Sequence, residues 1–146
     1  MRRSLALRLV GLWLSMVAAH AAGQQTPYLE PMPAGDAERG RLIFGTCRTC
    51  HYAEPAMGHN NGPNLHRIFG KVAGKQSGFD YYSETFKAAE FVWTPQLMFS
   101  WLEDPMAMFP ESTMMSLGIA DPQRRADLIA FLALASVREP LSAEPY

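Results

Sequence analysis

The apolar positions of the chain follow the period of an α-helix and nowhere alternate as they would in a strand. Ala37, Gly40 and Phe44 share one face of a helix, and Asp36 is suited to cap its first turn. We expect this helix to run into Cys47. Because no strand pattern and no internal repeat stands out, the chain is predicted to be all-α.

Three further helices are indicated by the residues that begin them. Ser83 is a capping residue, and the helix that it starts is expected to end near Ala89. A threonine followed by proline begins a helix over residues 94–104, and an aspartate followed by proline begins another over residues 121–136. The buried face of this last helix is predicted to consist of Leu128, Ile129, Phe131, Leu132 and Ala135.

Long loops separate these helices. Residues 52–80 are rich in glycine, asparagine and proline, and residues 105–117 show no helical period. Loops of this length are uncommon in a small domain unless they serve a function. We therefore predict three to four helices with long loops that wrap around a large buried cofactor.

The N-terminal residues have the features of a secretory signal. Residues 1–21 combine a basic start with a short apolar stretch and end in small residues suited to cleavage after Ala21. We expect export to the periplasm and no stable membrane insertion afterwards. The alternative is an uncleaved anchor, for which the apolar stretch is short. Residues 22–34 would then form a flexible arm, residues 35–137 the folded domain and residues 138–146 a C-terminal tail.

Composition and charge narrow the classes of function. The 146 residues are 48% apolar and 18% charged, which allows one folded domain and argues against disorder. The formal net charge is −1, and loss of three arginines with the signal would make it −4. This balance gives no reason to expect a nucleic-acid partner. Two cysteines are too few for a disulfide-rich scaffold.

The spacing of the two cysteines is more informative than their number. Cys47, Cys50 and His51 form the pattern C-x-x-C-H, which is the attachment motif of haem c. In that motif both thiols form thioethers with the haem vinyl groups, and the histidine offers an imidazole nitrogen to the iron. The motif therefore predicts a covalently bound haem.

Two other interpretations use the same residues. A thiol–disulfide redox pair is disfavoured because such a pair normally follows a strand, and none is predicted here. A zinc site would need a fourth ligand, and the candidates His59 and His66 are badly spaced for it.

Several motifs, taken together and in order, resemble the class I c-type cytochromes. The haem motif is followed by Gly-Pro-Asn-Leu at residues 62–65, at the spacing found in the family. Residues 127–132, Asp-Leu-Ile-Ala-Phe-Leu, match the last helix of the family. The resemblance extends from about Gly35 to Ser136 and is close to the mitochondrial and photosynthetic-bacterial type. It implies the cytochrome c fold and one haem c per chain.

The resemblance also implies the iron ligands. The family's second ligand is a methionine four residues after a proline, and Met114 stands in that position after Pro110. Composition does not choose among the methionines, and Met115 is the alternative if the loop shifts by one residue. Thioether ligation opposite a histidine is typical of electron carriers because it raises the reduction potential. The expected metal ligands are His51 and Met114.

Three more residues match positions that surround the haem in this family. The carbonyl of Pro63, twelve residues after His51, corresponds to the acceptor for the other imidazole nitrogen. Tyr81 and Trp93 resemble the donors to a buried propionate. For both aromatic residues the alternative is a purely structural place in the core.

We therefore predict a monomeric electron carrier, not an enzyme. Its partners would be redox proteins, such as a periplasmic dehydrogenase or a membrane oxidase or cytochrome complex. One alternative is a haem peroxidase or gas-binding cytochrome with a labile methionine ligand. Glu111 leaves this alternative open, because it lies in the loop around Pro110 and Met114, which we call the ligand loop. Another is a thiol–disulfide oxidoreductase that uses the cysteine pair.

One departure from the family concerns docking. The lysines that surround the haem edge in the mitochondrial proteins are absent here. We predict that Met106, Met108 and Phe109 form part of a hydrophobic docking patch instead. The alternative is that they pack against the haem edge.

Overall fold

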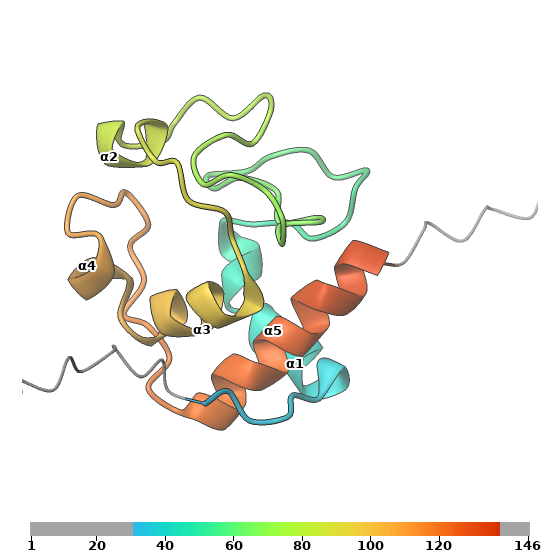
Figure 1. Ribbon diagram of the computed structural model, residues 1–146. Coiled ribbons are helices and arrows are strands. Elements are labelled where there is room, and N and C mark those ends of the chain that lie inside the picture. The colour runs from blue at the N-terminus through green and yellow to red at the C-terminus, as the bar shows by residue number, and fades with distance from the viewer. Residues whose placement is uncertain (1–30, 138–146) are drawn as a thin grey trace, which may run out of the picture.

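Helix α1 (Ala37–Phe44), near the start of the described chain, and helix α5 (Pro122–Val137), at its end, pack against each other (Figure 1). This computed structural model describes residues 31–137. Helix α3 (Pro95–Glu103) packs against α5, and long loops make up most of the remainder. Within the described range the only β pairing is an isolated bridge between Val72 and Val92. The prediction of an all-α fold is confirmed.

The crossing of α1 and α5 depends on glycine. A Cβ atom added to Gly40 would lie 1.9 Å from the carbonyl oxygen of Asp127, and one added to Gly35 would lie 2.1 Å from that of Ala126. No side chain can occupy either position without separating the two segments. Absence of a side chain at these glycines therefore sets how closely the helices approach.

A buried carboxylate ties the start of α1 to α5. Asp127 accepts hydrogen bonds from the Arg39 side chain at 2.7 and 2.8 Å, and from the backbone N–H of Asp36 at 2.8 Å. The Gln123 side chain donates a further bond at 3.0 Å. These donors, with Arg39 first among them, hold the pKa of Asp127 well below its usual range.

Side-chain caps begin three helices where the sequence predicts them. Asp36, Ser83 and Thr94 each accept a backbone N–H from the first turn of α1, α2 (Glu84–Lys87) and α3, respectively. Each cap satisfies a donor that the helix itself leaves without a partner. The starting points of these helices are thus confirmed.

Two predicted boundaries are wrong. Helix α1 ends at Phe44 instead of running into the first cysteine, which lies in a separate 3-10 turn, η1 (Cys47–Thr49). Residues 105–117, predicted as loop, begin with helix α4 (Pro105–Met108), capped by Asp104. The proline that ends α3 also suits the first turn of α4, because the N–H that it lacks has no partner there.

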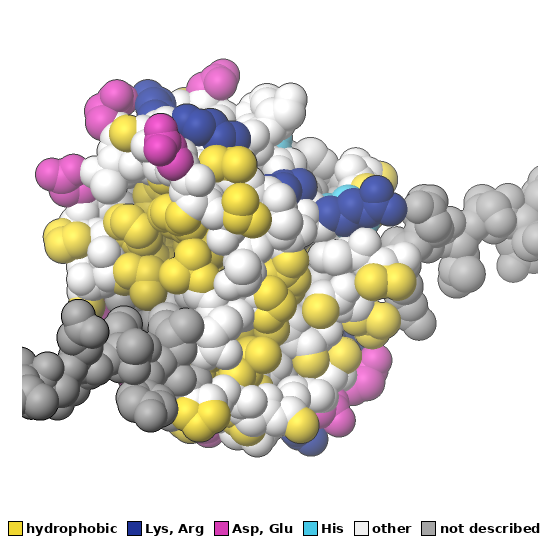
Figure 2. All heavy atoms as spheres, in the orientation of Figure 1, with side chains coloured by type: hydrophobic (Ala, Val, Ile, Leu, Met, Phe, Trp, Pro, Cys, Tyr) yellow, Lys and Arg dark blue, Asp and Glu magenta, His cyan; other side chains and the backbone are white. Residues whose placement is uncertain are grey.

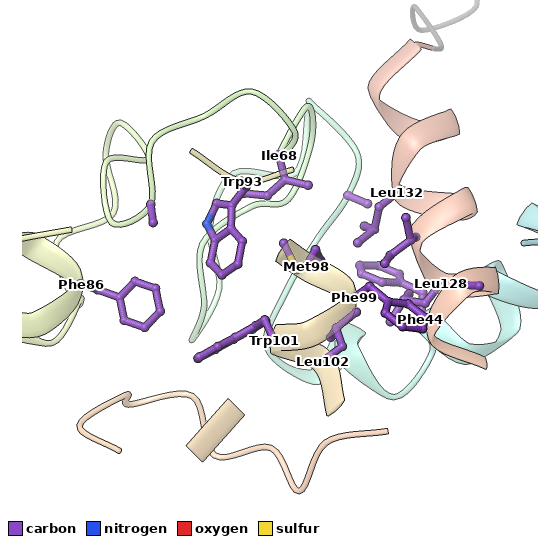
Figure 3. Close-up of a cluster of buried hydrophobic side chains, with 14 residues drawn as sticks. Phe44, Ile68, Phe86, Trp93, Met98, Phe99, Trp101, Leu102, Leu128 and Leu132 are labelled. Atoms are coloured by element: carbon purple, nitrogen blue, oxygen red, sulfur yellow. The ribbon is translucent and has the colours of Figure 1, made fainter. Parts of the chain in front are cut away.

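One cluster of apolar side chains forms the core (Figure 3). Phe44 of α1, Phe99 of α3 and Leu128 and Leu132 of α5 are all at most 2% exposed. The predicted stripe of α5 is largely confirmed, since Ile129 is also buried. The remaining two stripe residues border the cluster, namely Phe131 and Ala135.

Within residues 31–137 no helix is long and apolar enough to cross a membrane. The predicted signal over residues 1–21 and the predicted tail over residues 138–146 lie outside the described residues. The predicted arm lies outside them too, except for residues 31–34, which are not helical.

Candidate functional site

The two cysteines lie on a tight turn directly after α1. In η1 the backbone N–H groups of Cys50 and His51 both donate to the carbonyl of Cys47, at 3.0 and 2.8 Å. Both cysteines are free thiols and half-buried. The turn thus presents two thiols and an imidazole close together at the edge of the core.

The His51 ring is fixed by the loop that follows it. Its Nδ1 atom lies 2.7 Å from the carbonyl oxygen of Pro63. Since a carbonyl only accepts, Nδ1 carries the hydrogen and the lone pair of Nε2 is left available. Burial lowers the pKa of His51 and the bond to Pro63 opposes this in part, so the neutral ring is favoured. The acceptor expected from the sequence is therefore in place.

The backbone of Gly62 lies flat against this imidazole. A Cβ atom at Gly62 would stand 2.3 Å from Cε1 of the His51 ring and within 2.8 Å of both ring nitrogens. The Gly62 N–H also donates to the Cys50 carbonyl at 2.8 Å. Glycine here lets the loop close on the ring, and the loop in turn limits how the ring can tilt.

His59 braces the same loop. Its Nε2 atom lies 2.9 Å from the Ser77 carbonyl oxygen, and its Nδ1 atom accepts the backbone N–H of Asn64 at 3.0 Å. The Asn64 side chain donates to the carbonyls of Glu54 and Gly58, at 2.8 Å each. Both ring nitrogens of His59 are thus in use, which leaves none for a metal ion.

The two candidate methionines have different surroundings. Met114 is half-buried and packs against the core cluster, whereas Met115 is 98% exposed. The backbone N–H of Met114 donates to the Ser112 hydroxyl at 3.1 Å, which shapes the chain just before it. The Met114 thioether is therefore able to contact a group bound in the interior, whereas the Met115 side chain faces solvent.

The loop that carries Met114 is anchored at its far end by a buried arginine. Arg125 of α5 is fully buried, donates to the carbonyls of Ile119 and Ala120 at 2.9 Å each, and lies over the Phe99 ring at 4.4 Å. Sequence reasoning missed this residue, because it stands next to Arg124 in the polar first turn of α5, where no local signal marks one arginine as buried.

Tyr81 and Trp93 have different environments. Trp93 is 7% exposed, but Tyr81 is 79% exposed. Tyr81 borders an open cleft of about 500 Å³ together with Asn60, Asn61 and Thr113. The cleft is thus lined both by the loop after His51 and by Thr113, the residue before Met114.

A group of aromatic rings joins the ligand loop to α2. The Phe109 ring lies 5.2 Å from Phe86, 5.4 Å from Phe91 and 5.5 Å from Trp101, between ring centroids. Hydrophobic side chains gather on the surface between α2 and α4 (Figure 2). Of the predicted docking residues, Met108 and Phe109 pack against the core and only Met106, at 42%, is well exposed.

Neither alternative chemistry finds support at this site. Burial raises the pKa of the Cys47 thiol, whereas a reactive thiol needs a lowered one. In the described part of the chain no three His, Cys, Asp or Glu side chains converge as a metal site would require. The residues present fit a haem instead, since the chain offers paired thiols on one turn, an imidazole whose Nδ1 is held by Pro63 and whose Nε2 is available, and a half-buried thioether that packs against the core cluster.

Comparison with known proteins identifies the family, although no family model matches the chain. The chain is 43% identical over 105 residues to cytochrome c of Chlamydomonas reinhardtii, covering 71% of this chain and 93% of the relative. It is 34% identical over 120 residues to cytochrome c2 of Rhodomicrobium vannielii, covering 82% and 92%. The protein belongs to the class I c-type cytochromes.

Membership in this family decides several expectations. The fold is the cytochrome c fold, and the protein carries one covalent haem c. It is an electron-transfer protein that works with redox partners, not an enzyme. The peroxidase and thiol-oxidoreductase alternatives are therefore wrong.

Proposed function

We propose that the chain is a periplasmic electron carrier whose haem c has histidine and methionine as axial ligands. Cys47 and Cys50 form the thioethers, and His51 and Met114 bind the iron. The observation that carries the proposal is the state of the histidine, whose Nδ1–Pro63 contact of 2.7 Å leaves Nε2 available to a metal.

The assignment of Met114 rests on burial. Met115 is 98% exposed, so its sulfur faces water, whereas Met114 packs against the core. A thioether that stays bound must be held where water does not compete for the iron. The Ser112 hydroxyl and the Arg125 anchor hold the two ends of the loop segment around Met114.

Electron transfer then needs little from the protein beyond a fixed environment. When bound, the haem c would supply one-electron redox chemistry. The His51–Pro63 contact would hold the imidazole orientation in both redox states, and Trp93 and Trp101 are buried in the core cluster, away from water. With His51 and Met114 both as iron ligands, the protein would leave no ligand position open to a substrate.

Two aromatic residues complete the proposal. The hydroxyl of Tyr81 and the indole N–H of Trp93 would donate to a haem propionate. In support, Trp93 is buried within the core cluster, and Tyr81 borders the cleft that Thr113 also borders.

Export completes the assignment. Residues 1–21 are proposed to be a cleaved signal, followed by an arm to residue 34, with the domain over residues 35–137 and a tail over residues 138–146. The partners are then redox proteins of the periplasm or its membrane, such as a dehydrogenase or an oxidase or cytochrome complex.

Spectroscopy of the exported holoprotein tests the ligands. Met114→Leu is expected to abolish the methionine-to-iron charge-transfer band of the oxidised protein and to admit cyanide rapidly. Met115→Leu, the matched control, is expected to leave both properties unchanged. If Met115→Leu removes the band and Met114→Leu does not, the ligand assignment is wrong. Haem that acid-acetone extracts from the parent protein would overturn covalent attachment.

A further inference from the structure

Three large apolar side chains project into solvent around the ligand loop. Met115 is 98% exposed, Leu117 is 102% exposed and Met106 is 42% exposed. We call these three residues the loop patch. Fully exposed Met and Leu side chains two positions apart gain nothing from burial in the monomer, so they are free to be covered by another molecule.

Backbone contacts place two of the three residues, Leu117 and Met106, at one end of α3. The Ile119 N–H donates to the Leu102 carbonyl at 2.7 Å. A Cβ atom at Gly118 would lie 2.0 Å from the Glu103 carbonyl oxygen and 3.3 Å from Asp104 Cα. The segment that bears Leu117 therefore lies against the residues that lead directly into α4, where Met106 is the second residue.

The charged residues in the part of the chain that carries the loop patch are acidic. Residues 88–123 contain no lysine and no arginine. Five acidic residues in this stretch are exposed, and four of them lie between α3 and the start of α5: Glu103, Asp104, Glu111 and Asp121, with Glu90 before α3. Over the α4 loop, at the left of Figure 2, no Lys or Arg side chain is visible.

The next two cations along the chain are Arg124, which is exposed, and Arg125, which is turned inward. Arg125 is fully buried, and its guanidinium donates to the carbonyls of Ile119 and Ala120. Its charge is thus used within the fold, and the outer face of the ligand loop remains apolar with an acidic border.

We propose that the loop patch docks a redox protein whose contact surface is apolar at its centre and bordered by lysine or arginine. The inference rests on the proposed function, because Met115 directly follows the proposed ligand Met114 and docking here brings a partner close to the haem. Opposite charges at the border steer the two proteins together, and the apolar centre holds them briefly.

A redox reagent with the partner's chemistry probes this surface. Tris(1,10-phenanthroline)cobalt(III) is a cation with an apolar exterior, and hexacyanoferrate(III) is a hydrophilic anion. Oxidation of the reduced holoprotein by each reagent is followed by stopped flow for the parent, Leu117→Lys and Met115→Lys. Leu42→Lys is the matched control, since Leu42 is 69% exposed on α1, away from the ligand loop.

Each loop-patch variant is expected to slow the cobalt reagent about three- to tenfold and to accelerate hexacyanoferrate(III). Leu42→Lys is expected to change either rate less than about twofold. Leu117→Ser is expected to slow the cobalt reagent at high salt as well, where charge is screened, and so reports the apolar contribution. Equal effects of Leu117→Lys and Leu42→Lys would overturn the proposal.

Two further measurements distinguish this test from the test of the iron ligand. The charge-transfer band of each variant shows whether Met114 ligation is intact. Absence of the band in the parent would contradict the proposed ligand but not the proposed docking surface. Sedimentation of the parent tests self-association. A dimer that Leu117→Lys dissociates would mean that a second copy covers the patch, which contradicts a basic partner.

Discussion

Asp127 is a single residue that links segments distant in the sequence. Its carboxylate is buried, yet it receives donors from Arg39 and the Asp36 backbone, which lie about 90 positions earlier. A buried carboxylate without such partners would be costly, so its charge is retained because the donors converge on it. Sequence analysis recognised the motif that contains Asp127 but not this role.

We expect Asp127→Asn to lower the thermal midpoint at pH 7. The folded pKa of Asp127 lies below the value of about 3.9 usual for the unfolded chain, so the carboxylate stabilises the fold above that pH. This stabilisation is lost as the pH falls through the lower folded pKa. The difference in midpoint between parent and variant is therefore expected to be full at pH 7 and to shrink below about pH 4.

Thermal unfolding followed by circular dichroism from pH 7 to pH 3 measures this. Glu38→Gln is the control, since Glu38 pairs with Arg41 at 3.2 Å on the surface, where both side chains are more than half exposed. A difference between parent and Asp127→Asn that does not change with pH would argue against a role for the charge.

A site residue could be predicted from the sequence when the residues that define its role are its neighbours in the chain. Cys47, Cys50 and His51 are adjacent in sequence and their chemistry needs that spacing, so the motif identifies them. The roles of Arg125 and Asp127 depend on carbonyls and donors supplied by other segments. No local pattern records such contacts.

At the scale of elements, the ligand loop is held against α2 by two kinds of contact. The Thr85 hydroxyl, in α2, donates to the Glu111 carboxylate. The Phe109 ring packs on Phe86 of the same helix at 5.2 Å. The four residues of α2 thus act as a support for the segment that precedes Met114.

We expect loss of this support to loosen the methionine. Glu111→Ala or Thr85→Val removes one exposed hydrogen bond, worth about 0.5–1.5 kcal/mol. Exogenous imidazole should then bind the oxidised holoprotein about two- to tenfold more tightly, because the Met114 bond opens more often. Optical titration with imidazole gives the affinities.

The double variant and an unrelated acid complete the comparison. If the two side chains act through their mutual bond, Glu111→Ala with Thr85→Val together should weaken ligation no more than either alone. Glu90→Ala, an exposed acid in the segment after α2, should leave imidazole affinity unchanged. Additive effects would mean that the two residues act separately.

Helix starts were more predictable than helix ends. Caps such as Thr94, with proline after it, act within one turn and are visible in the sequence. The end of α1 at Phe44 follows from how the chain turns to present η1, and tertiary contacts decide such turns. Helix α4 begins with a local signal, Asp104 followed by Pro105, but its four residues are too few to show a helical period.

For the whole molecule, the haem is expected to act as part of the core. Helices α1 and α3 have 8 and 9 residues, less than an isolated helix needs for stability in water. Several apolar side chains near the site remain only partly buried by protein atoms, among them Leu65, Tyr82, Met114 and Ile119. A bound haem would cover them.

We expect the double variant Cys47→Ala with Cys50→Ala to lose most of its helical circular dichroism and its cooperative thermal transition. Without covalent attachment the haem dissociates and the binding free energy that supports the fold is lost. Thr49→Ala, in the same turn, should keep both properties. A haem-free double variant that melts cooperatively near the parent's temperature would show that the chain folds unaided.

The pairing of α1 with α5 has a consequence for the timing of folding. Asp36 and Asp127 are 91 positions apart, so α1 waits for its partner helix while the ribosome adds the intervening residues. At about 5–20 residues per second, this interval is roughly 5–18 seconds. Throughout it the growing polypeptide cannot complete its core, and the thiols of Cys47 and Cys50 stay accessible on an unfolded chain.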